Sequence, residues 1–276
     1  MKPISNTAFY CCGVRMLDAE NPKSVCQDIY AKYFMDERGL DIFAAFKTEK
    51  NPNAANVTRH RIIDDIVRAQ LLNNHELSVI LIGAGFDSRA YRMKGGNWIE
   101  LDEPQIIAYK NERLPIEQCP NKLNRIAINF ETESLEDKLQ CINSNQPVTI
   151  IFEGVFIYLP EEVIKQTLKI LHNLFPKHKL ICDLMTDSFY KRYSVRLHQK
   201  FVDLGASFKF NSAQPAAVFL ESNYQLLAKQ SILGKAIEYG SVKVPLFSVK
   251  VPFFIFKTFM KTLQHGYAIY IFKVNS

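Results

Sequence analysis

A glycine-rich turn after a short apolar run is the feature of this chain with the clearest chemical meaning. Residues 79–82 are Val, Ile, Leu and Ile, and they lead directly into Gly83, Ala84 and Gly85. Because glycine lacks a Cβ, the chain can turn sharply there and a ligand can approach the backbone closely. A strand that ends in such a turn and enters a helix presents backbone N–H groups to nucleotide-like ligands in many α/β proteins. The turn therefore predicts a site for a cofactor that contains a nucleoside.

An acidic residue follows at the distance expected for the end of a second strand. Asp102 lies nineteen residues after Gly83 and closes the run 98–102. An acid at this place can accept hydrogen bonds from both hydroxyls of a ribose. The dinucleotide pattern G-x-G-x-x-G is incomplete, because position 88 is Ser. The missing glycine argues against a dinucleotide, whose pyrophosphate packs on a helix N-terminus, more than against S-adenosylmethionine, which has no phosphate.

Strand and helix patterns alternate from residue 78 onward. The alternation predicts a parallel sheet with helices on both faces. Two late strands have no crossover helix clearly able to reach the last of them, so we expect an antiparallel closing hairpin at one sheet edge. Five parallel strands followed by such a hairpin are typical of class I methyltransferases rather than of dehydrogenases. The predicted strands are 78–83, 97–102, 124–129, 148–154, 179–185, 224–232 and 266–274.

Helical patterns fill the remaining parts of the chain. Residues 1–75 are expected to be mostly helical, and two further helices are expected at 104–113 and 160–174. The helix at 160–174 begins with Pro and two acids, which suit a helix N-terminus. Its apolar spacing predicts a buried stripe of Val163, Thr167, Ile170, Leu171 and Leu174.

Composition limits the class of protein. The chain has 276 residues, of which 47% are hydrophobic, enough for one large α/β domain or two small ones. The net charge of +6 comes from scattered Lys and Arg, which argues against nucleic acid as a partner. The six cysteines show no C-x-x-C and no metal spacing, so we expect reduced thiols, a cytoplasmic protein and no metal. Neither a signal peptide nor a transmembrane helix is predicted.

Four segments carry a resemblance to a known family. The chain resembles the leucine carboxyl methyltransferase family of S-adenosylmethionine-dependent O-methyltransferases, in the compact bacterial form that includes polyketide-type carboxyl O-methyltransferases. The resemblance covers most of residues 7–175, and the last 100 residues match only loosely. The matching segments are 82–92, 100–104 followed by Lys110, 152–160, and an N-terminal set of Thr7, Ala8 and Arg15 with Arg61, Asp64 and Asp65.

The resemblance implies the fold and its division. The fold is an α/β class I methyltransferase (Rossmann-like) with a mostly parallel seven-stranded sheet, an antiparallel C-terminal hairpin and a helical N-terminal extension. Residues 1–276 would form a single methyltransferase domain. Within it, 1–75 would be the helical extension or lid, 76–185 the cofactor-binding core, and 186–276 the substrate-side helices and closing strands.

The resemblance also implies cofactor roles for residues at the matching positions. Arg15 and Arg61 would hold the methionine carboxylate of S-adenosylmethionine, a role that suits the planar fork of a guanidinium. Gly83 and Gly85 would approach the methionine and the ribose. Asp102 would bind the ribose hydroxyls.

Three more positions belong to the expected site. Asn129 and Phe130 follow the third strand at the adenine position, where Asn replaces the usual Asp but keeps an acceptor oxygen. Glu153 would contact the ammonium or sulfonium side of the cofactor, or would instead pair with an Arg or a helix N-terminus. Tyr158 lies where the family places an aromatic residue beside the transferring methyl group, and packing in the core is the alternative.

The expected reaction makes few demands on side chains. A carboxylate acceptor has a pKa of about 4, so it is ionised at neutral pH and needs no general base. Positioning then becomes the main task of the protein. Arg192 and Arg196, four residues apart, would hold an anionic substrate, although a solvated basic face is the alternative. The apolar segment 244–259 would line a substrate cleft or pack as core.

Three functions remain open on this basis. The first is an S-adenosylmethionine-dependent O-methyltransferase whose partner is a small-molecule carboxylic acid, with no nucleic acid and no membrane involved. The second is an NAD(P)-dependent oxidoreductase on a similar sheet. The third is a non-catalytic descendant that binds the cofactor. The sequence leaves the methyl acceptor and the oligomeric state undetermined.

Overall fold

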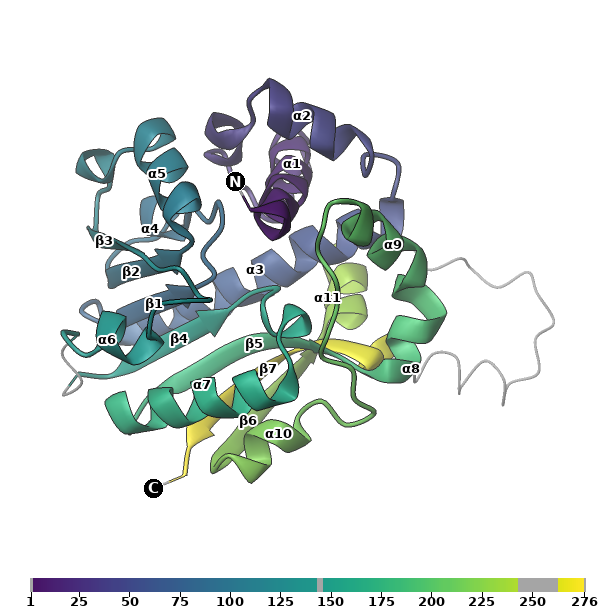
Figure 1. Cartoon of the computed structure of the whole chain (residues 1–276). Coiled ribbons are helices and arrows are strands. Elements are labelled where there is room, and N and C mark those ends of the chain that lie inside the picture. Colours follow the sequence, from purple (N-terminus) through teal and green to yellow (C-terminus); the bar gives the residue numbers. More distant parts are fainter. Residues whose placement is uncertain (1, 143–145, 243–262, 276) are drawn as a thin grey trace.

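The protein is built around one seven-stranded sheet with helices on both faces (Figure 1). The computed structural model describes residues 2–142, 146–242 and 263–275. The strand order is β3-β2-β1-β4-β5-β7-β6. The strands are β1 (Ser78–Ile82), β2 (Asn97–Asp102), β3 (Lys122–Ala127), β4 (Val148–Phe152), β5 (Lys179–Met185), β6 (Tyr224–Ser231) and β7 (Tyr267–Val274).

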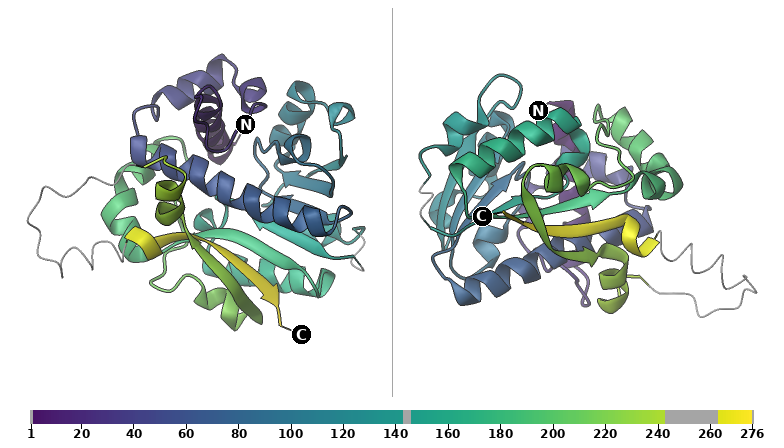
Figure 2. Two further views of the ribbon diagram at one scale, coloured as in Figure 1. Left: turned by 180° about the vertical axis from the view of Figure 1, so that it is seen from behind. Right: turned by 90° about the horizontal axis from the view of Figure 1, so that it is seen from below.

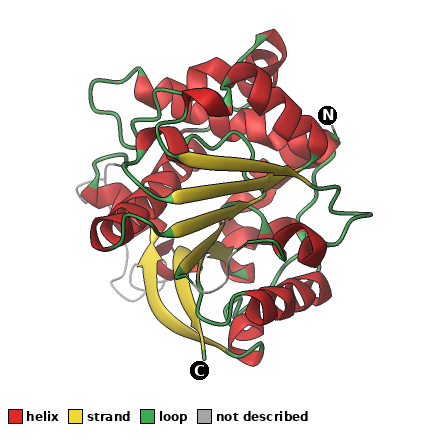
Figure 3. Ribbon diagram, turned by 90° about the vertical axis from the view of Figure 1, so that its left-hand side faces the viewer, coloured by secondary structure: helices red, strands yellow, loops and turns green. Residues whose placement is uncertain are grey.

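The first five strands are parallel, and β7 runs antiparallel to both β5 and β6 (Figure 3). This arrangement confirms the predicted sheet and its antiparallel closing hairpin. Two strands differ from prediction by two residues, and β1, β6 and β7 differ by one residue at one end. β3 lies two residues earlier than expected, and β4 ends at Phe152. Glu153 and Gly154 therefore lie beyond the end of β4.

Helices precede the sheet in the chain and then alternate with its strands. The helical content expected for residues 1–75 is confirmed. The α-helices are α1 (Thr7–Ala19), α2 (Glu37–Ala44), α3 (Lys50–Asn73), α4 (Arg89–Arg92), α5 (Pro104–Arg113), α6 (Leu135–Leu139), α7 (Glu161–Leu174), α8 (Asp187–Phe189), α9 (Val195–Asp203), α10 (Ala217–Glu221) and α11 (Ile232–Glu238). Shorter turns are η1 (Pro3–Asn6), η2 (Ala31–Phe34), η3 (Ile116–Gln118), η4 (Phe156–Tyr158) and the π-helical η5 (Tyr190–Ser194).

Two apolar layers cover the sheet, because successive side chains of a strand point to opposite faces. Val79 and Leu81 of β1 pack with α3, which crosses one face (Figure 2). Ile80 and Ile82 pack with α7 and α10 on the other face. Both faces of the central strands β1 and β4 are thus buried, which explains their nearly continuous apolar sequences, whereas the edge strand β3 is partly exposed.

The buried stripe of α7 differs from the predicted one. Its buried residues are Ile164, Thr167, Leu168 and Leu171. Thr167 and Leu171 were expected, whereas Val163 is 39% exposed, so the prediction for Val163 was wrong. The helix is rotated so that the neighbouring Ile164 and Leu168 enter the core.

Each of the six cysteines is free. Across the parts of the chain that the structure describes, no helix combines the length and the apolar character needed to cross a membrane. The cytoplasmic location stays a prediction.

Candidate functional site

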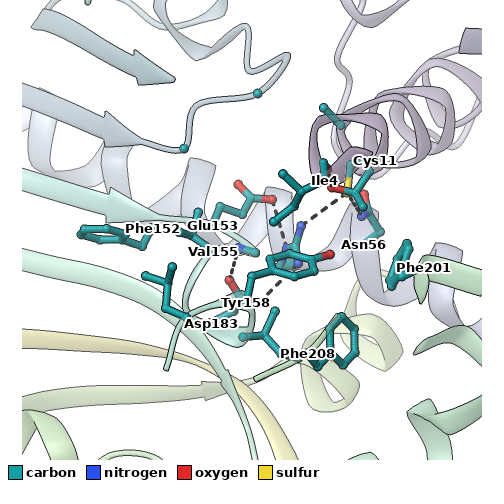
Figure 4. Close-up of a pocket in the computed structure, with 18 of the residues that line it drawn as sticks. Ile4, Cys11, Asn56, Phe152, Glu153, Val155, Tyr158, Asp183, Phe201 and Phe208 are labelled. Atoms are coloured by element: carbon teal, nitrogen blue, oxygen red, sulfur yellow. Dashed lines mark hydrogen bonds and ion pairs between the residues drawn. The ribbon is translucent and has the colours of Figure 1, made fainter. Parts of the chain in front are cut away.

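A cavity of about 1610 Å³ opens at the carboxyl ends of the parallel strands. Its walls come from the glycine turn after β1, from the ends of β2, β4 and β5, and from α1, α3, α9 and α11. In open α/β sheets, ligands bind in the crevice outside these strand ends. Figure 4 shows part of the lining, with Glu153 and Tyr158 among the residues that surround it.

The glycine turn has the geometry expected of it. Gly83 and Gly85 have φ angles of +70° and +46°, which side chains with a Cβ rarely adopt. A Cβ on Gly83 would also lie 2.6 Å from Val155 Cγ2. The N–H of Gly85 donates to Asp102 Oδ2 at 2.6 Å, so the turn is joined directly to the end of β2.

Asp102 lies in the cavity wall beside this turn. Its second oxygen, Oδ1, accepts from the backbone N–H of Glu103 at 2.7 Å. Burial raises the pKa of Asp102 to about 6, against the lowering effect of these two backbone donors. Asp102 therefore links the glycine turn after β1 to the end of β2, and its remaining lone pairs can accept hydrogen bonds from a ligand.

Glu153, just beyond β4, lies among three basic side chains. Its Oε2 is 2.8 Å from Arg89 Nη2 and 3.2 Å from His60 Nδ1, and its Oε1 is 3.1 Å from Arg59 Nε. Burial would raise the pKa of Glu153, but the positive charge of Arg89, with His60 and Arg59, holds it well below its usual range. The pairing of Glu153 with arginine, one of its two expected roles, is therefore present, and its carboxylate also lines the cavity.

His60, Asp87 and Glu153 bring three ligand atoms within 4.8 Å of one another. The guanidinium of Arg89 lies among them, because its Nη2 is 2.9 Å from His60 Nδ1 and its Nη1 donates to Asp87. Burial and the charge of Arg89 lower the pKa of His60. The cluster is an ion-pair network in which Arg89 takes the place that a cation would occupy.

Arg59 is the functional candidate that the sequence analysis missed. Its Nη1 lies 3.3 Å from Asp183 Oδ2 and 3.0 Å from the Tyr267 hydroxyl, which itself donates to Asp183 at 2.8 Å. Asp183 Oδ1 also accepts from the N–H of Gly154 at 2.5 Å. Arg59 thus joins α3 to the ends of β4, β5 and β7 at the cavity wall.

Arg61 is not brought together with the other predicted site residues. Its Nε pairs with Asp65 at 2.7 Å, its Nη1 donates to the Val25 carbonyl at 3.0 Å, and its guanidinium lies over the Tyr239 ring. Arg61 does not line the cavity. Helix geometry gives the reason: Arg59 shares the buried face of α3 with Ile63, whereas Arg61 is two residues out of phase with that face.

Arg15 lines the cavity from α1 and is buried. Its Nε pairs with Asp28 at 2.8 Å, and its Nη2 donates to the carbonyl of Phe86 at 2.7 Å. Burial raises the pKa of Asp28, but the charges of Arg92 and Arg15 lower it to about 2. Arg15 is therefore fixed beside the glycine turn.

Only one of the two residues expected near an adenine lines the cavity. Phe130 lines the cavity, whereas Asn129 does not. Asn129 Oδ1 accepts from Lys2 Nζ at 3.1 Å. Lys2 also pairs with Glu103 at 3.0 Å and with Glu131 at 3.3 Å, so the N-terminal segment lies across this part of the cavity.

Tyr158, in η4, lines the cavity and packs edge-on against Phe208, with 5.5 Å between ring centroids. Burial raises the pKa of Tyr158, so its phenol is protonated at neutral pH. Arg196 also lines the cavity, but its side chain is 83% exposed and lies 3.3 Å from Glu49.

Arg192 is not among the cavity-lining residues. It lies on the π-helical turn that precedes α9, so no regular α-helix joins Arg192 to Arg196. The predicted apolar segment 244–259 lies outside the described residues.

The strand order, the antiparallel β7 and the cavity beside the glycine turn define a class I methyltransferase fold. The model of the leucine carboxyl methyltransferase family matches residues 8–172. The chain belongs to this family.

Relatives and solved structures agree with this assignment. The chain is 28% identical over 173 residues to a protein of Streptomyces avermitilis and 29% identical over 178 residues to one of Mycolicibacterium smegmatis. Both are provisionally named as S-adenosyl-L-methionine-dependent methyltransferases. The matches cover 58% of this chain and 61% and 59% of those relatives, so the chain matches about three fifths of their length.

Two solved structures share the fold. A DUF574 family protein from Streptomyces avermitilis has a TM-score of 0.57 at 10% identity, over 90% of this chain and 96% of that one. Magnesium protoporphyrin IX methyltransferase from Synechocystis, solved with bound S-adenosylhomocysteine, has a TM-score of 0.50 at 14% identity, over 89% and 97%. At these identities the likeness concerns the fold alone.

Proposed function

We propose that this protein is an S-adenosylmethionine-dependent O-methyltransferase that methylates a carboxylate of a small molecule. The observation that carries the proposal is the cradle formed by Gly83, Gly85 and Asp102, which opens into a cavity of about 1610 Å³. Binding sites for single small molecules usually measure about 300–1,000 Å³, so the cavity has room for a cofactor and an acceptor together. Membership of the leucine carboxyl methyltransferase family supports the same activity.

The residues present fit S-adenosylmethionine. Asp102 offers acceptor lone pairs for ribose hydroxyls, and Phe130 offers a ring face for adenine. The ionised carboxylate of Glu153 suits the positive ammonium and sulfonium groups. Arg15 and Arg59 are the guanidinium groups in the wall for a methionine carboxylate. Nη2 of Arg59 faces the Cys11 sulfur at 3.9 Å, a weak acceptor, and so keeps donors for a ligand.

The chain's own residues have to bind, orient and exclude water. S-adenosylmethionine supplies an electrophilic methyl group on a sulfonium. A carboxylate acceptor with a pKa of about 4 is already ionised at neutral pH, so no residue has to remove a proton. Tyr158, with its raised pKa, keeps its proton, and its side chain positions the substrate by packing against it or by donating a hydrogen bond. Arg196, which lines the cavity, is a cation that an anionic acceptor would meet, whereas Arg192 is not among the lining residues.

We further propose that the single domain has three parts with different roles. Residues 1–75 would act as a lid, because η1 and α1 contribute Ile4, Thr7 and Cys11 to the cavity wall. Residues 76–185 would bind the cofactor, and 186–276 would shape the acceptor side.

A calorimetric titration with S-adenosylmethionine, S-adenosylhomocysteine and NAD tests the cofactor assignment. We expect saturable binding of the first two ligands and none of NAD. Binding of NAD alone would favour the oxidoreductase reading. Cofactor binding without methyl transfer to any acid or alcohol would favour the non-catalytic reading.

A further inference from the structure

Asn56, near the start of α3, is a buried polar side chain that lines the cavity and is only partly satisfied. It is 6% exposed. Its Nδ2 donates to Cys11 Sγ at 3.1 Å. Among the described residues, none donates a hydrogen bond to its buried Oδ1. A buried carbonyl oxygen without a donor destabilises the folded protein, and a bound ligand that donates to it removes that penalty.

The position of Asn56 places it on the acceptor side of the cavity. Just before α3, Glu49 pairs with Lys200 of α9 at 2.7 Å, so the first turns of α3 face α9. Phe201 of α9 lines the same cavity, and Figure 4 shows Asn56 between Cys11 and Phe201. The cofactor cradle lies at the ends of β1 and β2. The next turn of α3 contacts the strands on the other side of β4 in the sheet order, through Arg59 with Asp183 of β5 and Tyr267 of β7. Asn56 therefore faces the space that remains for an acceptor.

We infer that the methyl acceptor carries, besides its carboxylate, a hydroxyl or N–H group that donates a hydrogen bond to Asn56 Oδ1. This inference rests on the proposed function. The same cavity has an apolar part of its wall that includes Leu197, Phe201 and Phe208. A few placed polar groups in such a wall fix the orientation of a ligand, and here the bond would turn the carboxylate toward the methyl donor.

Chain-length-matched acids test the inference directly. The probes are dodecanoic acid and its derivatives with a hydroxyl or an oxo group at carbon 3, 6 or 9. Their affinities are measured by calorimetry on the protein saturated with S-adenosylhomocysteine. We expect at least one hydroxy acid to bind about tenfold or more tightly than both dodecanoic acid and its own oxo partner, because only the hydroxyl satisfies Oδ1. The oxo group can only accept a hydrogen bond. Tighter binding of an oxo acid than of its hydroxy partner would therefore show that the amide offers its NH2 group, and would overturn the inference.

Two variants test whether Asn56 causes the preference for the hydroxy acid. Asn56→Leu should reduce the preference for the hydroxyl to below about threefold while leaving S-adenosylhomocysteine affinity within about twofold of wild type. Asn73→Leu, at the exposed far end of the same helix, is the matched control and should keep the wild-type preference. An unchanged preference in Asn56→Leu, or a loss of S-adenosylhomocysteine affinity, would overturn the inference.

The same experiment separates this inference from the proposed function. If the Leu variant fails to fold, Asn56→Ala takes its place, and the comparison of the unsubstituted, hydroxy and oxo acids on the wild-type protein needs no variant. Equal binding of the hydroxy and unsubstituted acids refutes only the role of Asn56 and leaves the proposed function standing. Failure of S-adenosylhomocysteine to bind at all refutes the proposed function instead.

Discussion

The buried carboxylate of Glu153 provides the sharpest test of the ion network at the site. Glu153→Gln keeps the size of the side chain but removes the negative charge that faces Arg59, His60 and Arg89. Removing one partner of a buried ion pair destabilises a protein by about 3–5 kcal/mol. Arg89 keeps two other carboxylate partners and Arg59 keeps one, so we expect the lower end, about 3 kcal/mol.

Thermal and denaturant unfolding measure this loss. About 3 kcal/mol corresponds to a fall in Tm of about 5 °C for a chain of this length. Glu162→Gln, on the exposed first turn of α7, is the matched control and should change stability by less than about 0.5 kcal/mol. A Glu153→Gln protein as stable as this control would refute the reasoning.

The pH dependence of stability, compared between wild type and Glu153→Gln, gives an independent check. The pKa of Glu153 is lower in the folded protein than its ordinary value of 4.5. The stability it contributes is therefore present above about pH 4.5 and is lost as the pH falls below that value. The difference between wild type and Glu153→Gln should narrow from pH 6 toward about pH 3.5. A constant difference over this range would contradict the assigned charge.

Three further predictions concern the turn, a buried histidine and the two arginines. Gly83→Ala should destabilise the protein by at least about 1 kcal/mol more than Gly240→Ala in denaturant unfolding, because both have positive φ but only the first would place a Cβ against a neighbouring side chain. Burial lowers the pKa of His178 to about 4, so the stability due to its neutral form is present above pH 6.5 and is lost as the pH falls toward 4. His178→Phe should flatten that part of the Tm-against-pH curve. Arg59→Leu should weaken S-adenosylhomocysteine binding about tenfold or more in calorimetry, and Arg61→Leu by less than about threefold, since only the first lines the cavity.

Much of the sheet could be predicted because its signals are local. The strands buried on both faces show short, nearly continuous apolar runs, and Gly83 and Gly85 mark the turn where the first run ends. The ends of elements were less certain, since β4 stops at Phe152 and leaves Glu153 in the loop. The two residues concerned, Glu153 and Gly154, both line the cavity.

The site was harder to predict, because its contacts join distant parts of the chain. Arg59 meets Asp183 and Tyr267, which lie 124 and 208 residues further along, and no local pattern encodes those pairs. One signal was available in α3. Arg59 falls at helical spacing with Ile62, Ile63 and Ile66, so it shares their buried face, whereas the polar spacing of Arg61 with Asp65 and Arg68 indicates a more exposed one.

The transfer of a labelled methyl group tests the central claim most directly. The protein is incubated with S-adenosylmethionine labelled in its methyl group and with the acids described above, and the product is then exposed to mild alkali. We expect transfer to the acid and release of the label as methanol, because a methyl ester hydrolyses under these conditions. The rate of transfer should stay nearly flat from about pH 6 to pH 8, since a carboxylate of pKa about 4 is ionised throughout. Retention of the label after alkali, as an ether would show, would contradict the carboxyl assignment.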